Sequence, residues 1–109
     1  MSENSHRDAA AVVVSSGRGH RCVGTTALIA FNRELDAHRA WIDIVETFEI
    51  AEGLEVPRIE LSIYGDHGAY DLPVAERRKL AADRLAEMLA AIGNESADFC
   101  FDVWLDREG

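Results

Sequence analysis

The sequence predicts an α+β fold, in which an antiparallel β-sheet of about four to five strands packs against one long helix near residues 73–92. Residues 98–106 alternate between apolar and polar side chains, as a strand with one buried face does. Residues 74–92 repeat their apolar side chains at three- and four-residue steps, the spacing of one helix face. A helix stripe and a sheet face of this kind can bury each other in one core.

The first segments of the chain are expected to be a tail followed by a β-hairpin. Residues 1–8 are polar and are predicted to be flexible, so that residues 9–109 form a single domain. AAVVVSS at 10–16 is a β-branched run, and CVGTTALIAF at 22–31 is a second apolar stretch. Glycines between them predict a hairpin joined around residues 17–20.

WIDIVETFEI, residues 41–50, can be read as a strand or as part of a helix. A helix near 33–52, capped by Asn32 and ended by Gly53, would give the order βαββαβ, the ferredoxin-like arrangement. The many β-branched and aromatic residues of the segment pack well on a pleated sheet but lose side-chain entropy in a helix. We therefore favour the strand and keep the ferredoxin-like order as the alternative.

The second half of the chain is predicted to be strand, helix and strand. Residues 58–64 alternate as a strand does, and GDHG at 65–68 supplies its turn. Pro73 suits the first turn of a helix, and Gly93 is expected to end that helix in a left-handed conformation. The last strand is expected to turn Phe99, Phe101, Val103 and Leu105 inward.

Composition places the chain among small globular proteins. It has 109 residues, 48% of them hydrophobic and 28% charged, which suits one domain. The polar N-terminus lacks the features of a secretory signal, and no apolar run approaches the ~20 residues of a membrane span, so we expect a cytoplasmic protein. In that compartment Cys22 and Cys100 are expected to be free, buried thiols.

The negative charge is concentrated in the middle of the chain. Residues 1–42, 43–76 and 77–109 carry net charges of +1, −8 and −2, and the whole chain carries −9. Phosphate contacts need Lys or Arg, and the chain has a single lysine, so direct nucleic-acid binding is not expected. A surplus of carboxylates instead favours a protein partner with a basic surface.

A row of acidic residues is the candidate partner-binding site. Its first members fall at every third position, and Glu60 follows them. Carboxylates within one or two Debye lengths, ~8 Å each at physiological salt, add their fields and attract a cationic surface. The predicted site consists of Asp43, Glu46, Glu49, Glu52, Glu55 and Glu60.

The sequence contains no recognisable catalytic, metal or cofactor motif. Zinc sites usually show two closely spaced ligand pairs, and only one loose pair, His20 with Cys22, is present. A nucleophile elbow, a metalloprotease HExxH and a dinucleotide fingerprint are all missing. The sequence therefore predicts no catalytic residue, no metal site and no cofactor.

We expect a small, acidic, non-enzymatic protein-binding module, an inhibitor or immunity-type protein that docks its acidic surface on a basic, nucleic-acid-handling partner. Anti-defence or defence proteins of phages and bacteria are one setting that fits. A small enzyme or ligand-binding domain using His67 with Asp66 or Asp71 is the first alternative. A homo-oligomeric accessory domain that pairs through a free strand edge, as a homodimer would, is the second.

Overall fold

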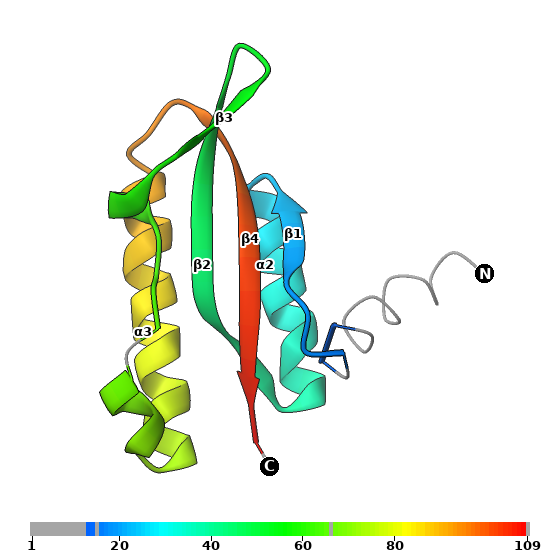
Figure 1. Ribbon diagram of the computed structural model, residues 1–109, viewed down its shortest axis with the longest axis vertical. Helices are drawn as coiled ribbons and strands as arrows, with labels where there is room; N and C mark the ends of the chain where they lie inside the picture. Colours follow the sequence, from blue (N-terminus) through cyan, green and yellow to red (C-terminus); the bar gives the residue numbers. More distant parts are fainter. Residues whose placement is uncertain (1–12, 15, 66, 109) are drawn as a thin grey trace, which may run out of the picture.

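A computed structural model describes residues 13, 14, 16–65 and 67–108 (Figure 1). The predicted tail at 1–8 lies outside the described residues. The main elements follow the order β1 (His20–Val23), α2 (Thr25–Leu35), β2 (Ala40–Ala51), β3 (Leu54–Pro57), α3 (Val74–Ile92) and β4 (Asp98–Arg107). Short 3-10 turns lie at Asp36–His38, Ile59–Leu61 and His67–Asp71. The predicted α+β class is confirmed, with an antiparallel sheet and the long helix at its predicted position.

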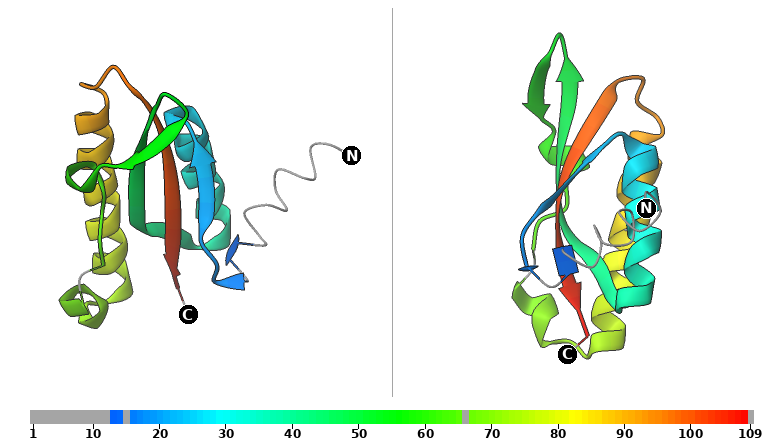
Figure 2. Two further views of the ribbon diagram at one scale, coloured as in Figure 1. Left: turned by 45° about the horizontal axis from the view of Figure 1, so that its top comes forward. Right: turned by 90° about the vertical axis from the view of Figure 1, so that its right-hand side faces the viewer.

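The four strands lie in the order β1-β4-β2-β3, and every neighbouring pair is antiparallel. β1 and β2 therefore run parallel to each other on either side of β4, and helix α2 connects them. Helix α3 likewise connects β3 to β4 across β2. Figure 2 shows both helices on the same side of the sheet, as two right-handed crossover connections require.

One hydrophobic core fills the space between the sheet and the two helices. Helix α2 contributes side chains at three- and four-residue steps, and α3 does the same along its inner face. Val45, Phe101 and Val103 of the sheet are fully buried beneath them. The helix residues of this core are Leu28, Phe31, Leu35, Leu85, Met88 and Ile92.

Residues 41–50 are a strand, so the favoured reading is confirmed and the helix near 33–52 is wrong. A register shift between Ile42 and Ile44 interrupts the pairing of β2 with β4. The order βαββαβ of the alternative is nevertheless found, because its first helix lies at 25–35 instead.

Glu52 and Gly53, with φ of 53° and 78°, form the two-residue turn between β2 and β3.

The hairpin predicted around residues 17–20 is wrong. Residues 13, 14 and 16 are helical, and β1 pairs with the distant strand β4. The stretch read as a strand at 22–31 is split at Gly24, whose φ of 90° separates β1 from α2. Leu28, Phe31 and Leu35 then repeat with helical spacing, and burial of that face outweighs the weak β propensity of the segment.

Two further predictions are wrong in detail. Residues 58–64 form no continuous strand, because Ile59–Leu61 is a 3-10 turn and only Ile63 bridges to Val45 of β2. Gly93 ends α3 in a right-handed conformation, with φ of −60°, and its N–H still donates to the carbonyl of Leu89. The helix thus stops by tightening its last turn instead of by a left-handed residue.

Candidate functional site: an acidic sheet face

The two helices leave one face of the sheet uncovered, and we call it the open face. Neighbouring strand residues point to opposite sides of a sheet. Since Phe99, Phe101 and Val103 are buried under the helices, the residues between them point the other way. By the same alternation and register, the open face comprises Arg21, Val23, Ile44, Glu46, Phe48, Ile50, Glu55, Asp98, Cys100, Asp102 and Trp104.

Arginine and carboxylate side chains from three strands meet at the centre of the open face. Arg21 of β1 donates to both carboxylate oxygens of Asp102, at 2.9 and 3.1 Å, and to Glu55 of β3 at 2.6 Å. Hydrogen bonds to Asp102 and Glu55 raise the pKa of the Arg21 guanidinium. The guanidinium also lies 5.9 Å from the ring centre of Phe48. Asp102 stands directly opposite Glu46 in the register.

The open face therefore has an excess of negative charge. Glu46, Glu55, Asp98 and Asp102 face a single guanidinium, Arg21, which leaves a net charge of −3. Neither Glu46 nor Asp98 has an ion pair with any described residue.

Aromatic side chains lie among these carboxylates. Phe48 and Trp104 are half-buried. Gly19 leaves room for the Trp104 indole, since a Cβ at Gly19 would come within 2.9 Å of the ring. Charge and aromatic surface are thus combined on one face.

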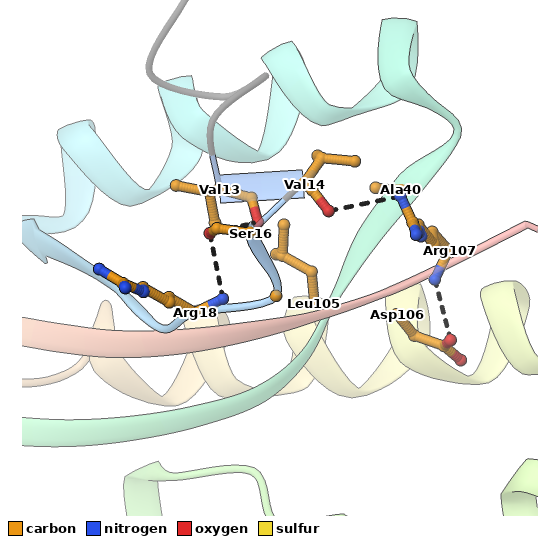
Figure 3. A pocket seen from close by; sticks show the side chains of 9 residues that line it. Val13, Val14, Ser16, Arg18, Ala40, Leu105, Asp106 and Arg107 are labelled. Atoms are coloured by element: carbon orange, nitrogen blue, oxygen red, sulfur yellow. Dashed lines mark hydrogen bonds between the residues drawn. The ribbon is translucent and has the colours of Figure 1, made fainter.

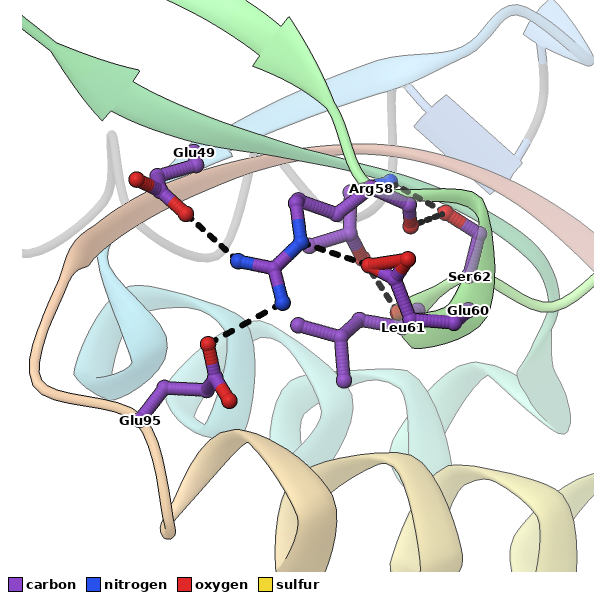
Figure 4. Close-up of polar contacts among 7 residues, drawn as sticks. Glu49, Arg58, Glu60, Leu61, Ser62 and Glu95 are labelled. Carbon is purple, nitrogen blue, oxygen red and sulfur yellow. Dashed lines mark hydrogen bonds and ion pairs between the residues drawn. The ribbon is translucent and has the colours of Figure 1, made fainter.

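A second group of predicted site residues is bound by an arginine on the opposite side of the sheet (Figure 4). Arg58 binds Glu49 of β2 at 2.5 Å, Glu60 of the following turn at 2.5 Å and Glu95 after α3 at 3.0 Å. The hydrogen bond from Arg58 lowers the pKa of Glu60. This cluster ties the segment after β3 to the end of α3, and we assign it a structural role.

The remaining two predicted site residues lie apart from both groups. Asp43 accepts a hydrogen bond from the hydroxyl of Tyr70, which together with burial raises the Tyr70 pKa to about 12. Glu52 lies exposed in the β2–β3 turn. The structure therefore brings Glu46 and Glu55 together on the open face and separates Asp43, Glu49, Glu52 and Glu60 from them.

The structure leaves the alternative catalytic site untested, because the side chain of His67, like Asp66, lies outside the part of the chain that it describes. Asp66 lies outside the described residues, and Asp71 is exposed at the end of a 3-10 turn. His20 stacks on Phe31, with ring centres 4.3 Å apart. Within the ranges that the structure describes, no three His, Cys, Asp or Glu side chains are placed to hold a metal ion.

Both cysteines are buried free thiols, as expected. Burial raises the pKa of Cys22 to about 11, and burial followed by the nearby Glu55 carboxylate raises that of Cys100. Thiolate is the reactive form of cysteine, so neither thiol is suited to nucleophilic chemistry at neutral pH.

A hollow of about 450 Å³ lies between the start of the described chain and the end of β4 (Figure 3). The backbone N–H of Arg18 donates to Ser16, and the Arg107 guanidinium donates to the carbonyl of Val14 at 3.4 Å. Figure 3 shows the two arginines at opposite sides of the hollow. The two guanidinium groups are therefore not placed to bind one anion together.

Sequence reasoning missed three charged members of the open face: Arg21, Asp98 and Asp102. The alternation of residues 98–106 already placed Asp98 and Asp102 on one side of a strand. That signal could have identified them once β4 was known to pair with β2. Nothing local could have identified Arg21, which lies 81 residues from Asp102 in the sequence.

No protein-family model, curated protein or solved structure matches the chain. No helix in the described part of the chain is long and apolar enough to cross a membrane. Function must therefore be inferred from the geometry of the site alone.

Proposed function

We propose that the protein is a non-enzymatic binding module that docks the open face of its sheet on a basic surface of a protein partner. The observation that carries this proposal is the net charge of −3 on the open face, where carboxylates of β2, β3 and β4 share the face with the half-buried rings of Phe48 and Trp104. Charge complementarity of this kind steers association and selects the partner.

The contacts of Arg21 support arginine as the partner residue that this face receives. Asp102 accepts hydrogen bonds from two nitrogens of the Arg21 guanidinium, Nε and Nη2. The Phe48 ring forms a cation–π contact with the same guanidinium. Glu46, which lies opposite Asp102 in the register, offers a further carboxylate that forms no ion pair with any described residue. Nucleic-acid-handling proteins expose arginine-rich surfaces, so an inhibitor or immunity-type role toward such a protein is the function we favour.

A labelled oligoarginine peptide provides the direct test. We expect it to bind, and to bind much more weakly at high salt, because screening weakens interactions between exposed charges. The double variant Glu46→Gln, Asp98→Asn removes the unpaired carboxylates of the open face. We expect this variant to raise the Kd about tenfold, which corresponds to 1.4 kcal/mol.

The matched control is the double variant Glu76→Gln, Glu87→Gln, which removes the same charge from exposed positions of α3. Its Kd should stay within about twofold of the wild-type value, since these side chains belong to the helix layer. Equal losses in both double variants would mean that only the net charge matters, and the proposed docking face would be rejected. Capture of a basic protein from the native host by the wild type, but not by the open-face variant, would identify the partner.

A further inference from the structure

The two edge strands of the sheet, β1 and β3, differ in what they offer to another strand. Arg58 donates its backbone N–H to Thr47 of β2, so the alternating pattern turns the backbone of Glu55 and Pro57 outward. Pro57 has no N–H, which leaves Glu55 as the one outward donor of β3. A short strand that ends in proline is a blunted edge.

The outer edge of β1 has no such protection. Gly24 donates its N–H to Phe99 of β4, so the same alternation turns the N–H and C=O groups of Arg21 and Val23 outward. No described strand pairs with these groups. Val23 is 66% exposed, and the Arg21 side chain extends over the open face to Asp102 and Glu55.

A groove of about 230 Å³ runs beside this edge, between β1 and α2. Ala27 and Ala30 of α2 are exposed in its wall, and Phe31 lies between them and β1. Glu34 is the one carboxylate among the described residues that line the groove. Arg21 and Glu34 are thus the charged residues of the groove lining, and the lining has no net charge although the whole chain carries −9.

We propose that β1 pairs antiparallel with β1 of a second copy, so that the two sheets join into one eight-stranded sheet. A register centred on Cys22 sets Arg21 opposite Val23 of the partner subunit, and every outward N–H and C=O of both residues gains a partner. A register centred on Arg21 would place two guanidinium groups directly opposite, which is destabilising. The Cys22-centred register is therefore the one we expect.

Charge argues for a second copy at this edge. The charged residues of β1 and α2 are Arg21, Arg33 and Glu34, which give these two elements a net charge of +1. Glu34 is the one acidic residue of these two elements, so few carboxylates lie at the contact itself. The exposed alanines allow the two α2 helices to approach, and the two-fold axis leaves both open faces on the same side of the joined sheet. The inference is independent of the partner proposed for the open face.

Sedimentation velocity of the full chain tests the proposal. We expect a species of twice the chain mass of 12.0 kDa. Val23→Lys adds a charge to the edge at an exposed position and should raise the dimer dissociation constant about tenfold or more. Val56→Lys, the same change at an exposed position of β3, should leave the dimer intact. A monomer at all concentrations, or equal effects of the two variants, would overturn the proposal.

Amide hydrogen exchange gives a second measurement that needs no substitution. The N–H groups of Arg21 and Val23 should exchange more slowly as the protein concentration rises, because dimer formation pairs them. The N–H of Glu55, on the outer edge of β3, should exchange at the same rate throughout. A dimer in which the β1 amides gain no protection would show that another surface mediates self-association and would also overturn the proposal.

Discussion

Glu46 of β2 and Asp102 of β4 stand directly opposite each other in the sheet, with both carboxylates on the open face. Like charges in this position are destabilising. Arg21 compensates Asp102 but forms no ion pair with Glu46. A surface that retains such a pair at a cost in folding free energy is better explained by binding than by stability.

Glu46→Gln should therefore stabilise the fold. We expect the free energy of unfolding to rise by roughly 0.2–1 kcal/mol, because the repulsion of Asp102 is removed. Urea denaturation at low salt measures the change, and the gain should shrink at high salt. Asp102→Asn serves as the opposite control, since it also removes the partner of Arg21 and should lower stability. Destabilisation by Glu46→Gln would contradict this account of the pair.

Long, regular patterns made several elements predictable from the sequence. The apolar stripe of α3 and the alternation of β4 each extend over enough residues to leave one consistent reading. The density of β-branched and aromatic residues correctly indicated β2. The strand predicted at residues 22–31 is wrong because the break at Gly24 lies inside an apolar run, where strand and helix segments have the same composition.

The site was less predictable than the fold, for an electrostatic reason. A count of charges along the chain cannot show which cation lies beside which carboxylate. Arg58 forms ion pairs with Glu49 and with Glu60, which lies in a turn predicted to be a strand. Arg21 reaches Glu55 across two intervening strands. The fold therefore places the acidic residues of this row on both sides of the sheet.

Thr47 is the one buried polar side chain within the described core, and its hydroxyl has a specific role. It is 1% exposed and donates to the carbonyl of Leu61 at 2.7 Å, which fixes the 3-10 turn against β2. Thr47→Val leaves that carbonyl unpaired and should lower the free energy of unfolding by about 1–3 kcal/mol. Thr47→Ser keeps the hydroxyl and should cost about 1 kcal/mol or less. Equal stability of the valine variant, measured by chemical denaturation, would refute the role of this hydrogen bond.

The bond between Tyr70 and Asp43 predicts a pH dependence. The Tyr70 pKa is raised from 10.0 to about 12, chiefly by the hydrogen bond to Asp43. Because the raised value favours the protonated phenol in the folded state, this stabilisation is complete below pH 10 and is lost as the pH rises toward 12. In a Tyr64→Phe background, tyrosinate absorbance should report Tyr70 alone, since the chain has two tyrosines. Asp43→Ala should move the titration midpoint toward 10.0, and an unchanged midpoint would exclude Asp43 as the cause.

The turn between β2 and β3 holds a residue in a conformation that does not suit it. Glu52 has a φ of 53°, which lies in the left-handed region. Residues that carry a Cβ adopt this region at a cost in free energy. With Gly53 at 78°, the pair has the backbone of a type I′ turn, for which Asn-Gly is preferred. Glu52→Asn should raise the free energy of unfolding by about 0.5–1 kcal/mol, measured by thermal or urea denaturation. Gly53→Ala, which forces a Cβ into the same region, should lower it by a similar amount. Stabilisation by both variants would show that some other feature of the hairpin, and not the sign of φ, limits the stability of this turn.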